Sequence, residues 1–507
     1  MNNTLKKNLI INFVITLIVG IFAFVINKYF VIYLGIEKLG VMNLFNQLLV
    51  YVTLVETGLG AASTYALYKP LAQKDYTMIN IVISTITSIY NKIFILILMI
   101  GLSANLILPY LFRNVVFTND IYIYWSLYVI NTASSYILVK YVILFTADQR
   151  FGFVRLVQGI IKICCQILQL IVIIKFKSFY LFIILMILSV LFEFIFYRAY
   201  FRKNYTYVSR TDRKDRSIGK NMKRLICHKI GGLVVSNTDF LLISKFISIQ
   251  TVGIYASYQM ITATITKIFD IVFKVLEPMV GKYLAEVSIE DAFEFWKKLN
   301  IFFLFCSTIF SYCTYKLISK FIYLWLGKEF LLSPVTVSLL CINLFVVLFR
   351  QILDIFKNCF GFFKDVHLPI LEAFINLVLS LILVLRIGLN GIIIGTIVSN
   401  IIIICIARPI LVFKCCFKKN IRDYIKIYGN YVILVAVTIV ILEVVANFFF
   451  NESFNEGQTY WHIWLMESIA WFLLSFIITF IIFFYNTDFR MVVKKVFSNY
   501  YIQRKHK

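Results

Sequence analysis

Long runs of hydrophobic residues recur along the whole of this chain. A transmembrane helix needs about 20 consecutive, mainly apolar residues to cross the hydrocarbon core of a bilayer. Runs of this kind predict fourteen transmembrane helices, centred near residues 20, 52, 95, 133, 162, 189, 237, 262, 307, 342, 377, 400, 438 and 474. Together with their loops, these helices use up all 507 residues and leave no soluble domain. The predicted fold class is therefore all-α, a polytopic integral membrane protein.

Polar segments divide the predicted helices into groups. Residues 1–200 hold helices 1–6, residues 201–227 form a basic linker, and residues 228–412 hold helices 7–12. Residues 413–507 hold helices 13 and 14 and a basic tail. The last two helices are predicted to be an appendage, in which the single acids Glu443 and Glu467 pair with each other.

The most unusual stretch runs from Gly231 to Glu277, two hydrophobic helices joined by a turn at Gln250–Gly253. Helical spacing places one set of polar side chains of the second helix on a single face: Tyr255, Gln259, Thr262, Thr266, Asp270 and Glu277. Lys267 and Lys274 flank this polar stripe. An unsatisfied polar group in hydrocarbon costs roughly 2–7 kcal/mol, so the stripe is predicted to face protein or a water-filled cavity.

The stripe has a counterpart in the predicted second helix, where Asn46, Thr53, Thr57 and Thr64 share one face. An offset of 213 residues superposes Gly40 on Gly253 and, in register, pairs the two polar faces: Asn46 with Gln259, Thr53 with Thr266, Thr57 with Asp270, and Thr64 with Glu277. Six helices separate the copies, an even number, so the two repeats are predicted to be parallel. Transporters built from two such repeats place the substrate between them.

Composition and charge agree with a membrane protein. Hydrophobic residues make up 61% of the chain and charged residues only 15%. The net charge of +25 is concentrated in alternate loops, with 36 Lys and Arg on one side of the membrane and 10 on the other. This is the positive-inside pattern, which predicts cytoplasmic termini and no nucleic-acid partner. The scattered cysteines and four histidines predict no metal site, and no cofactor is expected.

Several short motifs, in this order, resemble the polysaccharide-exporter branch of the multidrug/oligosaccharidyl-lipid/polysaccharide (MOP) flippase superfamily. One is the Leu-Gly-x-Glu-x-x-Gly turn at residues 34–40, and another is Glu56-Thr57-Gly58-Leu59-Gly60. The Ala-Asp-Gln-Arg loop at residues 147–150, the Thr238-Asp239 step and the Val-Gly-Ile-Tyr turn at residues 252–255 complete the set. The resemblance covers essentially the whole chain.

The resemblance implies two six-helix lobes around a V-shaped cavity, lined mainly by helices 1, 2, 7 and 8. It implies a substrate, a polyprenyl-diphosphate-linked oligosaccharide moved from the cytoplasmic to the outer leaflet of a bacterial plasma membrane by alternating access. In related lipid flippases, cations on helices 1 and 8 face the cavity, and Lys28 and Lys267 are the corresponding residues here. Polysaccharide polymerases or assembly proteins are expected partners.

These features define the candidate site. Lys267 is predicted to contact phosphate, with Lys28 as a second cation, whereas hydroxyls and amides would serve the sugars: Asn46, Thr53, Thr57, Gln259 and Thr266. The acids have alternative roles. Asp270 can form an in-helix ion pair with Lys267, Glu56 can pair with a neighbouring helix, and Asp239 can bind a coupling H⁺ or Na⁺ or make an interhelical hydrogen bond. The membrane potential is an alternative driving force.

Other functions remain open at this level. A lipid II flippase would call for more cavity arginines, and a cation-coupled multidrug and toxin extrusion antiporter would call for a more acidic and aromatic cavity. A membrane glycosyltransferase or polymerase needs a large external loop with catalytic acids, but the outer loops are short and Glu452 and Glu456 lie in a small one.

Overall fold

The computed structural model describes residues 3–53, 59–111, 119–213, 238–362, 365, 367–449 and 460–494. Every regular element in these ranges is a helix, and none is a strand. Eleven helices in the described part of the chain are long and apolar enough to cross a membrane. The predicted all-α, multi-pass membrane fold is therefore confirmed.

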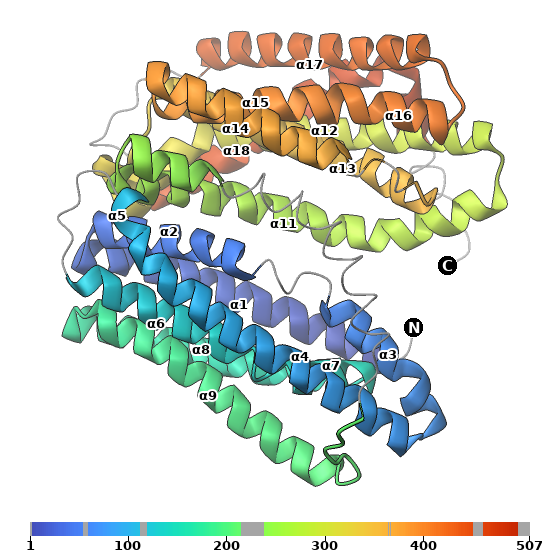
Figure 1. Cartoon of the computed structure of the whole chain (residues 1–507). Coiled ribbons are helices and arrows are strands. Elements are labelled where there is room, and N and C mark those ends of the chain that lie inside the picture. The colour runs from blue at the N-terminus through green and yellow to red at the C-terminus, as the bar shows by residue number, and fades with distance from the viewer. Residues whose placement is uncertain are drawn as a thin grey trace. The chain divides into compact units, whose positions relative to one another are not determined.

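The chain divides into two compact units, Met1–Gly253 and Ile254–Lys507, and the boundary falls within helix α11. Figure 1 shows the order of the helices in each unit. The first unit holds α1 (Asn3–Leu34), α2 (Ile36–Val52), α3 (Leu59–Gln73), α4 (Tyr76–Ser103), α5 (Leu108–Leu111), α6 (Asn119–Ser135), α7 (Val139–Ala147), α8 (Phe151–Phe176) and α9 (Phe179–Asn204), and the helical residues 238–246. The second holds most of α11 (Ile249–Glu286), with α12 (Ile289–Leu326), α13 (Pro334–Cys359), α14 (His367–Ile387), α15 (Leu389–Asn400), α16 (Arg408–Cys415), α17 (Ile421–Phe449) and α18 (Trp461–Phe484).

The region of the second predicted transmembrane helix holds two described helices, and residues 54–58 between them, including Thr57 of the polar stripe, lie outside the described residues, so the prediction of one continuous helix is not tested there. α2 ends at Val52, and α3 begins at Leu59. The hydroxyl of Thr53, at the end of α2, donates to the carbonyl of Val50 at 3.1 Å. Such a local bond competes with the helical ladder and favours a helix end. At the start of α2, Gly35 has φ 89°, a left-handed conformation that glycine adopts readily.

The predicted turn at Gln250–Gly253 is also wrong, because α11 already begins at Ile249. Ser248 explains the early start, since its hydroxyl accepts a hydrogen bond from the backbone N–H of Thr251 at 3.0 Å and caps the helix. Gly253 therefore lies inside a helix. α11 itself is not among the eleven apolar spans, as expected for a helix that carries the polar stripe.

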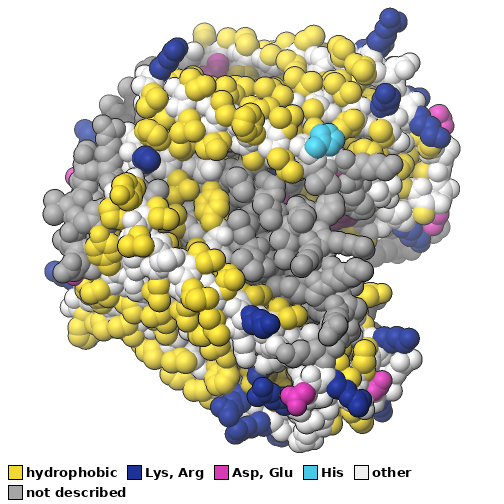
Figure 2. Space-filling view, viewed as in Figure 1, with side chains coloured by type: hydrophobic (Ala, Val, Ile, Leu, Met, Phe, Trp, Pro, Cys, Tyr) yellow, Lys and Arg dark blue, Asp and Glu magenta, His cyan; other side chains and the backbone are white. Residues whose placement is uncertain are grey.

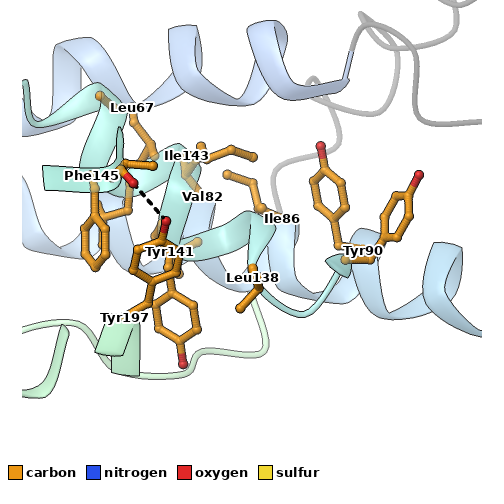
Figure 3. Close-up of a cluster of buried hydrophobic side chains, with 14 of the residues drawn as sticks. Leu67, Val82, Ile86, Tyr90, Leu138, Tyr141, Ile143, Phe145 and Tyr197 are labelled. Atoms are coloured by element: carbon orange, nitrogen blue, oxygen red, sulfur yellow. Dashed lines mark hydrogen bonds between the residues drawn. The ribbon is translucent and has the colours of Figure 1, made fainter. Parts of the chain in front are cut away.

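The core of the first unit is formed mainly by side chains of α4 and α7, to which α9 adds the buried Tyr197 (Figure 3). Leu144, Phe145 and Tyr197 are fully buried there, and the Tyr197 hydroxyl donates to the carbonyl of Val154 at 3.3 Å. In lipid, helices associate through close packing and interhelical hydrogen bonds, because exclusion of water contributes little. This aromatic core thus holds together three helices that are distant in sequence.

Small residues bring α14 and α15 together in the second unit. A Cβ added at Gly391 would collide with the backbone of Leu383, and one added at Gly395 would collide with Ser380. The Ser380 hydroxyl also donates to the carbonyl of Ile392 at 3.2 Å. Glycine and serine at a helix crossing allow this approach of the two backbones.

The two C-terminal helices are tied to α12 by ion pairs. The Lys316 ammonium lies 2.9 Å from the Glu443 carboxylate of α17, and the Lys320 ammonium lies 2.9 Å from the Glu467 carboxylate of α18. The prediction that Glu443 and Glu467 pair with each other is wrong. Two lysines, one helical turn apart on α12, each pair with one of the acids. Paired with each other, the two carboxylates would repel.

Candidate functional site

A cavity of about 330 Å³ lies between α11 and α13 in the second unit. Its polar lining comes from the predicted stripe of α11 and from one residue of α13: Gln259, Thr262, Thr266, Lys267, Asp270 and Asn343. Ala263, Leu340, Leu344 and Val347 form the apolar part of the wall. The structure therefore brings together in one cavity the four candidate site residues that the sequence places on this helix.

Most polar groups of the cavity are held by hydrogen bonds. The Gln259 amide donates to the Tyr255 hydroxyl at 2.6 Å, and the Thr266 hydroxyl donates to the carbonyl of Thr262 at 2.9 Å. Across the cavity, the Asn343 side-chain oxygen accepts from the Asn400 amide at 2.8 Å. These bonds restrict the side-chain rotamers, so the cavity presents amide and hydroxyl groups in defined positions.

Lys267 and Asp270 do not form an ion pair with each other. The Asp270 carboxylate instead accepts a hydrogen bond from the Gln351 amide of α13 at 3.1 Å. Lys267 is exposed at the cavity and has no ion-pair partner among the residues that the structure describes. The cavity thus holds one cation and one carboxylate that do not pair with each other.

The candidate residues of the first unit have varied environments. Lys28 is half-buried on α1 and makes no ion pair within the described ranges. Asn46 is exposed on α2, and Thr53 bonds to its own helix. Glu56 and Thr57 lie outside the described residues. The assignment of these residues to substrate binding stays a prediction.

Asp239 is buried, with 8% of its surface exposed, in the helical residues 238–246. It lies close enough to Tyr51 of α2 to interact with it electrostatically. A buried carboxylate at membrane depth is costly without such neighbours, and residues of this kind are typical of ion pathways. The role of Asp239 as a coupling group stays a prediction.

The sequence reasoning missed a buried ionic network in the second unit. Arg408 of α16 lies 3.0 Å from Asp354, 3.8 Å from Asp365 and 3.9 Å from Glu372. Lys357 also pairs with Asp365, at 2.9 Å. The side chains of Arg408, Asp365 and Glu372 are only 6–8% exposed. This network connects α13, α14, α16 and the segment between α13 and α14.

Two glycines related by the internal repeat meet at the start of α2 and of α11. A Cβ at Gly40 would overlap the carbonyl oxygen of Ile249, and a Cβ at Gly253 would lie 2.9 Å from the carbonyl oxygen of Ile36. The offset of 213 residues relates Ile36 to Ile249 as well. It also relates Glu37 to Gln250, whose side chains are joined by a hydrogen bond of 2.8 Å. All of these residues lie in the first unit, which ends at Gly253, and they contact each other at positions that are equivalent in the repeat.

Solved structures of transporters share this fold. A lipid II flippase MurJ in an inward closed conformation matches with a TM-score of 0.67 at 14% identity, covering 94% of this chain and 99% of that one. An inward-facing multidrug resistance MATE family transporter of the MOP superfamily matches with a TM-score of 0.63 at 15% identity, covering 79% and 96%. A MATE transporter of Vibrio cholerae, VcmN, matches with a TM-score of 0.51 at 15% identity, covering 82% and 100%.

No protein-family model matches the sequence, and no curated protein sequence matches it either. At identities of 14–15% the structural likeness shows the fold alone. The chain has the polytopic helical fold that MurJ and MATE transporters share, and its structural neighbours are flippases and transporters.

Proposed function

We propose that this protein is a flippase that moves a polyprenyl-diphosphate-linked oligosaccharide from the cytoplasmic to the outer leaflet by alternating access. One observation carries the proposal: a cavity lined by amides, hydroxyls and Lys267, which forms no ion pair with a described residue, lies among the helices of the second unit. Polar groups at membrane depth destabilise a protein, so this many of them are not explained by a structural role alone. The resemblance of the motifs and the shared fold agree with this function.

The cavity fits a polar head group joined to a diphosphate. The Lys267 ammonium attracts phosphate oxygens, and the amides and hydroxyls of Gln259, Thr262 and Asn343 can donate to and accept from sugar hydroxyls. The cost of carrying such a head group through hydrocarbon is thereby lowered, while the polyprenyl tail stays in lipid. Asp239 and Asp270 are the candidates for a coupling H⁺ or Na⁺.

The charge distribution supports a location. Alternate loops and ends hold 36 Lys and Arg in total, against 10 in the remaining loops, and by the positive-inside rule this asymmetry supports cytoplasmic termini. We propose the plasma membrane of a bacterium, where a flippase of this kind would supply a polysaccharide polymerase or assembly protein on the outer side.

Two alternative substrates have an observation in their favour. A lipid II substrate is favoured by the likeness to a lipid II flippase over 94% of the chain. A cation antiporter is favoured by the carboxylate of Asp270 in the cavity, together with the likeness to MATE transporters. A lipid-linked substrate needs the cation Lys267, whereas an organic cation would be repelled by it.

A deletion strain distinguishes these substrates. Loss of the protein is expected to trap a lipid-linked oligosaccharide in the inner leaflet, and mass spectrometry of the accumulated glycolipid identifies the repeat unit. Accumulation of lipid II instead would select the first alternative. Normal surface polysaccharide in a strain without a second flippase, together with greater sensitivity to cationic drugs, would select the second.

Replacing Lys267 by alanine is expected to reduce export by roughly 10- to 100-fold, since a hydrogen bond to a charged group contributes about 1.5–3 kcal/mol. The measurement is the rate at which labelled lipid-linked oligosaccharide becomes accessible on the outer face. Lys274→Ala is the matched control, because Lys274 lies two turns further along α11, is exposed and does not line the cavity. Equal export by the two variants at equal protein level would refute the phosphate role.

A further inference from the structure

A second cavity, of about 390 Å³, lies in the first unit and plays no part in the proposed transport site. It is formed by α4, α7, the end of α9 and the segment that follows α9. Its lining is rich in hydroxyls and carries two cations and one acid: Ser84, Thr87, Ser88, Ser209, Thr211, Lys140, Arg210 and Asp212. Ile83, Phe201 and Val208 complete the wall.

The segment after α9 folds back along α4 and closes the cavity. The backbone N–H of Ser209 donates to the Asn80 side-chain oxygen at 2.9 Å, and the backbone N–H of Thr211 donates to the Ser84 hydroxyl at 3.0 Å. The rings of Tyr76 and Tyr207 lie 4.5 Å apart. Residues of a polar linker are thus held in place against a membrane-spanning helix, so the cavity is a built feature of the fold.

Tyr205 anchors the start of this segment. It is buried, and its hydroxyl donates to the Asp148 carboxylate at 2.7 Å. Burial, together with the hydrogen bond to Asp148, raises the pKa of the Tyr205 hydroxyl, so it keeps its proton and remains a donor. The anchor joins the segment to the loop after α7, the helix that supplies Lys140.

The electrostatics of the cavity favour an anion. Neither Lys140 nor Arg210 forms an ion pair with any residue that the structure describes. Arg198 of α9 is close enough to Lys140 to repel it. Asp212 is the one acid in the lining, so the cations there exceed the acids. Figure 2 shows several Lys and Arg side chains, with a few Asp and Glu among them, at the bottom of the view, on the first unit.

Several hydroxyl groups are placed to donate, whereas the Thr87 hydroxyl already donates to the carbonyl of Ile83 at 2.8 Å. Ser84 and Thr211 each accept a bond from a backbone N–H, which leaves their own hydroxyl protons free to turn into the cavity. Ser88 makes no hydrogen bond to any described residue. Oxygens of a phosphate group accept several hydrogen bonds at once, and they combine well with lysine and arginine.

We propose that this cavity binds a phosphate group. The depth of the cavity fits a lipid head group: Lys140 lies seven residues before the end of α7, about 10 Å along the helix, in the span that ends at Ala147. A soluble phosphate ester presents the same chemistry. The site would let the first unit hold an anionic ligand on the side of the membrane where its basic loops are predicted to lie.

Native mass spectrometry tests whether the bound phosphate belongs to a lipid head group. The purified protein is kept in mixed micelles that contain equal amounts of phosphatidylglycerol and phosphatidylcholine. The wild type is expected to retain one phosphatidylglycerol molecule at least about fivefold more often than the double variant Lys140→Gln/Arg210→Gln. Lys92→Gln is the matched control, because Lys92 is exposed on α4 but lies outside the cavity lining, and it should behave as the wild type.

Whether the cavity binds a soluble phosphate is tested by thermal unfolding of the protein in inorganic phosphate and in chloride at the same ionic strength. Phosphate is expected to raise the unfolding temperature of the wild type and of Lys92→Gln, but not of the double variant. Ser88→Leu, which fills the cavity and keeps both cations, should lose binding as well. A purely structural role predicts that the double variant unfolds at a lower temperature; phosphate binding predicts that it does not, because removing Lys140 relieves its repulsion by Arg198. Equal retention of lipid together with no effect of phosphate would overturn the proposal.

Discussion

Replacing Arg408 by leucine is expected to lower the free energy of unfolding by about 3–5 kcal/mol, the cost of leaving buried charges without their partner. Its guanidinium is the common partner of Asp354, Asp365 and Glu372, all within 4 Å of it. Only 8% of the Arg408 side chain is exposed, so water cannot replace the lost interactions. The measurement is unfolding by sodium dodecyl sulfate in mixed micelles, followed by tryptophan fluorescence.

Arg350→Leu is the matched control for this prediction. Among the described residues, Arg350 makes one ion-pair contact, of 4.0 Å with Asp354, and interacts with Glu372 at longer range; a third of its side chain is exposed. Its loss should therefore cost about 0–1 kcal/mol. The difference between the two variants should shrink as the pH is lowered, because protons then neutralise the carboxylates that lack a partner. A difference that does not depend on pH would point to lost packing of the arginine side chain.

The fold was largely predictable from the sequence because a lipid-exposed helix must be apolar over its whole length. Eleven apolar spans in the described chain correspond to predicted runs, and four of the six side chains of the polar stripe of α11 lie on one cavity wall, as its spacing implies. Both inferences depend only on helical periodicity and on the cost of polar groups in hydrocarbon. Neither requires knowledge of which helices are neighbours.

Predictions that depended on neighbours were less successful. Glu443 was assigned to Glu467, whereas each acid pairs with a lysine of α12. The network around Arg408 was missed because its members come from three helices and a connecting segment, so no local pattern joins them. One signal was available in the sequence, because Arg350 and Asp354 lie four residues apart within an apolar run. Charged residues inside a membrane-spanning helix usually have a charged partner on another helix.

The predicted starts of α2 and α11 differ from those in the structure because of how two glycines were interpreted. Gly40 and Gly253 were both interpreted as turn residues, because glycine is frequent in turns. The structure uses Gly35 for the turn before α2 and Ser248 as the cap of α11, and keeps both glycines inside helices. A glycine in a membrane helix has a second explanation, the close approach of another backbone. Sequence alone does not separate these two uses.

Replacing Gly40 by alanine is expected to destabilise the protein by about 1–3 kcal/mol, the cost of overpacking, because the new Cβ would overlap the carbonyl oxygen of Ile249. The start of α2 and the start of α11 must then move apart. Gly253→Ala should have a similar effect through the carbonyl oxygen of Ile36, since the two positions are equivalent in the repeat. Unfolding in mixed micelles measures both. Gly60→Ala is the control, because its Cβ would meet nothing within 4 Å, and it should be neutral or slightly stabilising.

The double variant Gly40→Ala/Gly253→Ala separates a shared contact from two local effects. If both glycines allow the same close contact between the starts of α2 and α11, the first substitution already moves the two helices apart. The second Cβ then meets no neighbouring atom. The double variant should then lose clearly less stability than the sum of the two single variants, whereas independent local effects would add. If the proposed flippase alternates between two states through this contact, each single variant should also slow export, and the hydrogen bond between Glu37 and Gln250 should be lost with it. Additive losses of stability with unchanged export would show that the repeat-related glycines serve folding alone.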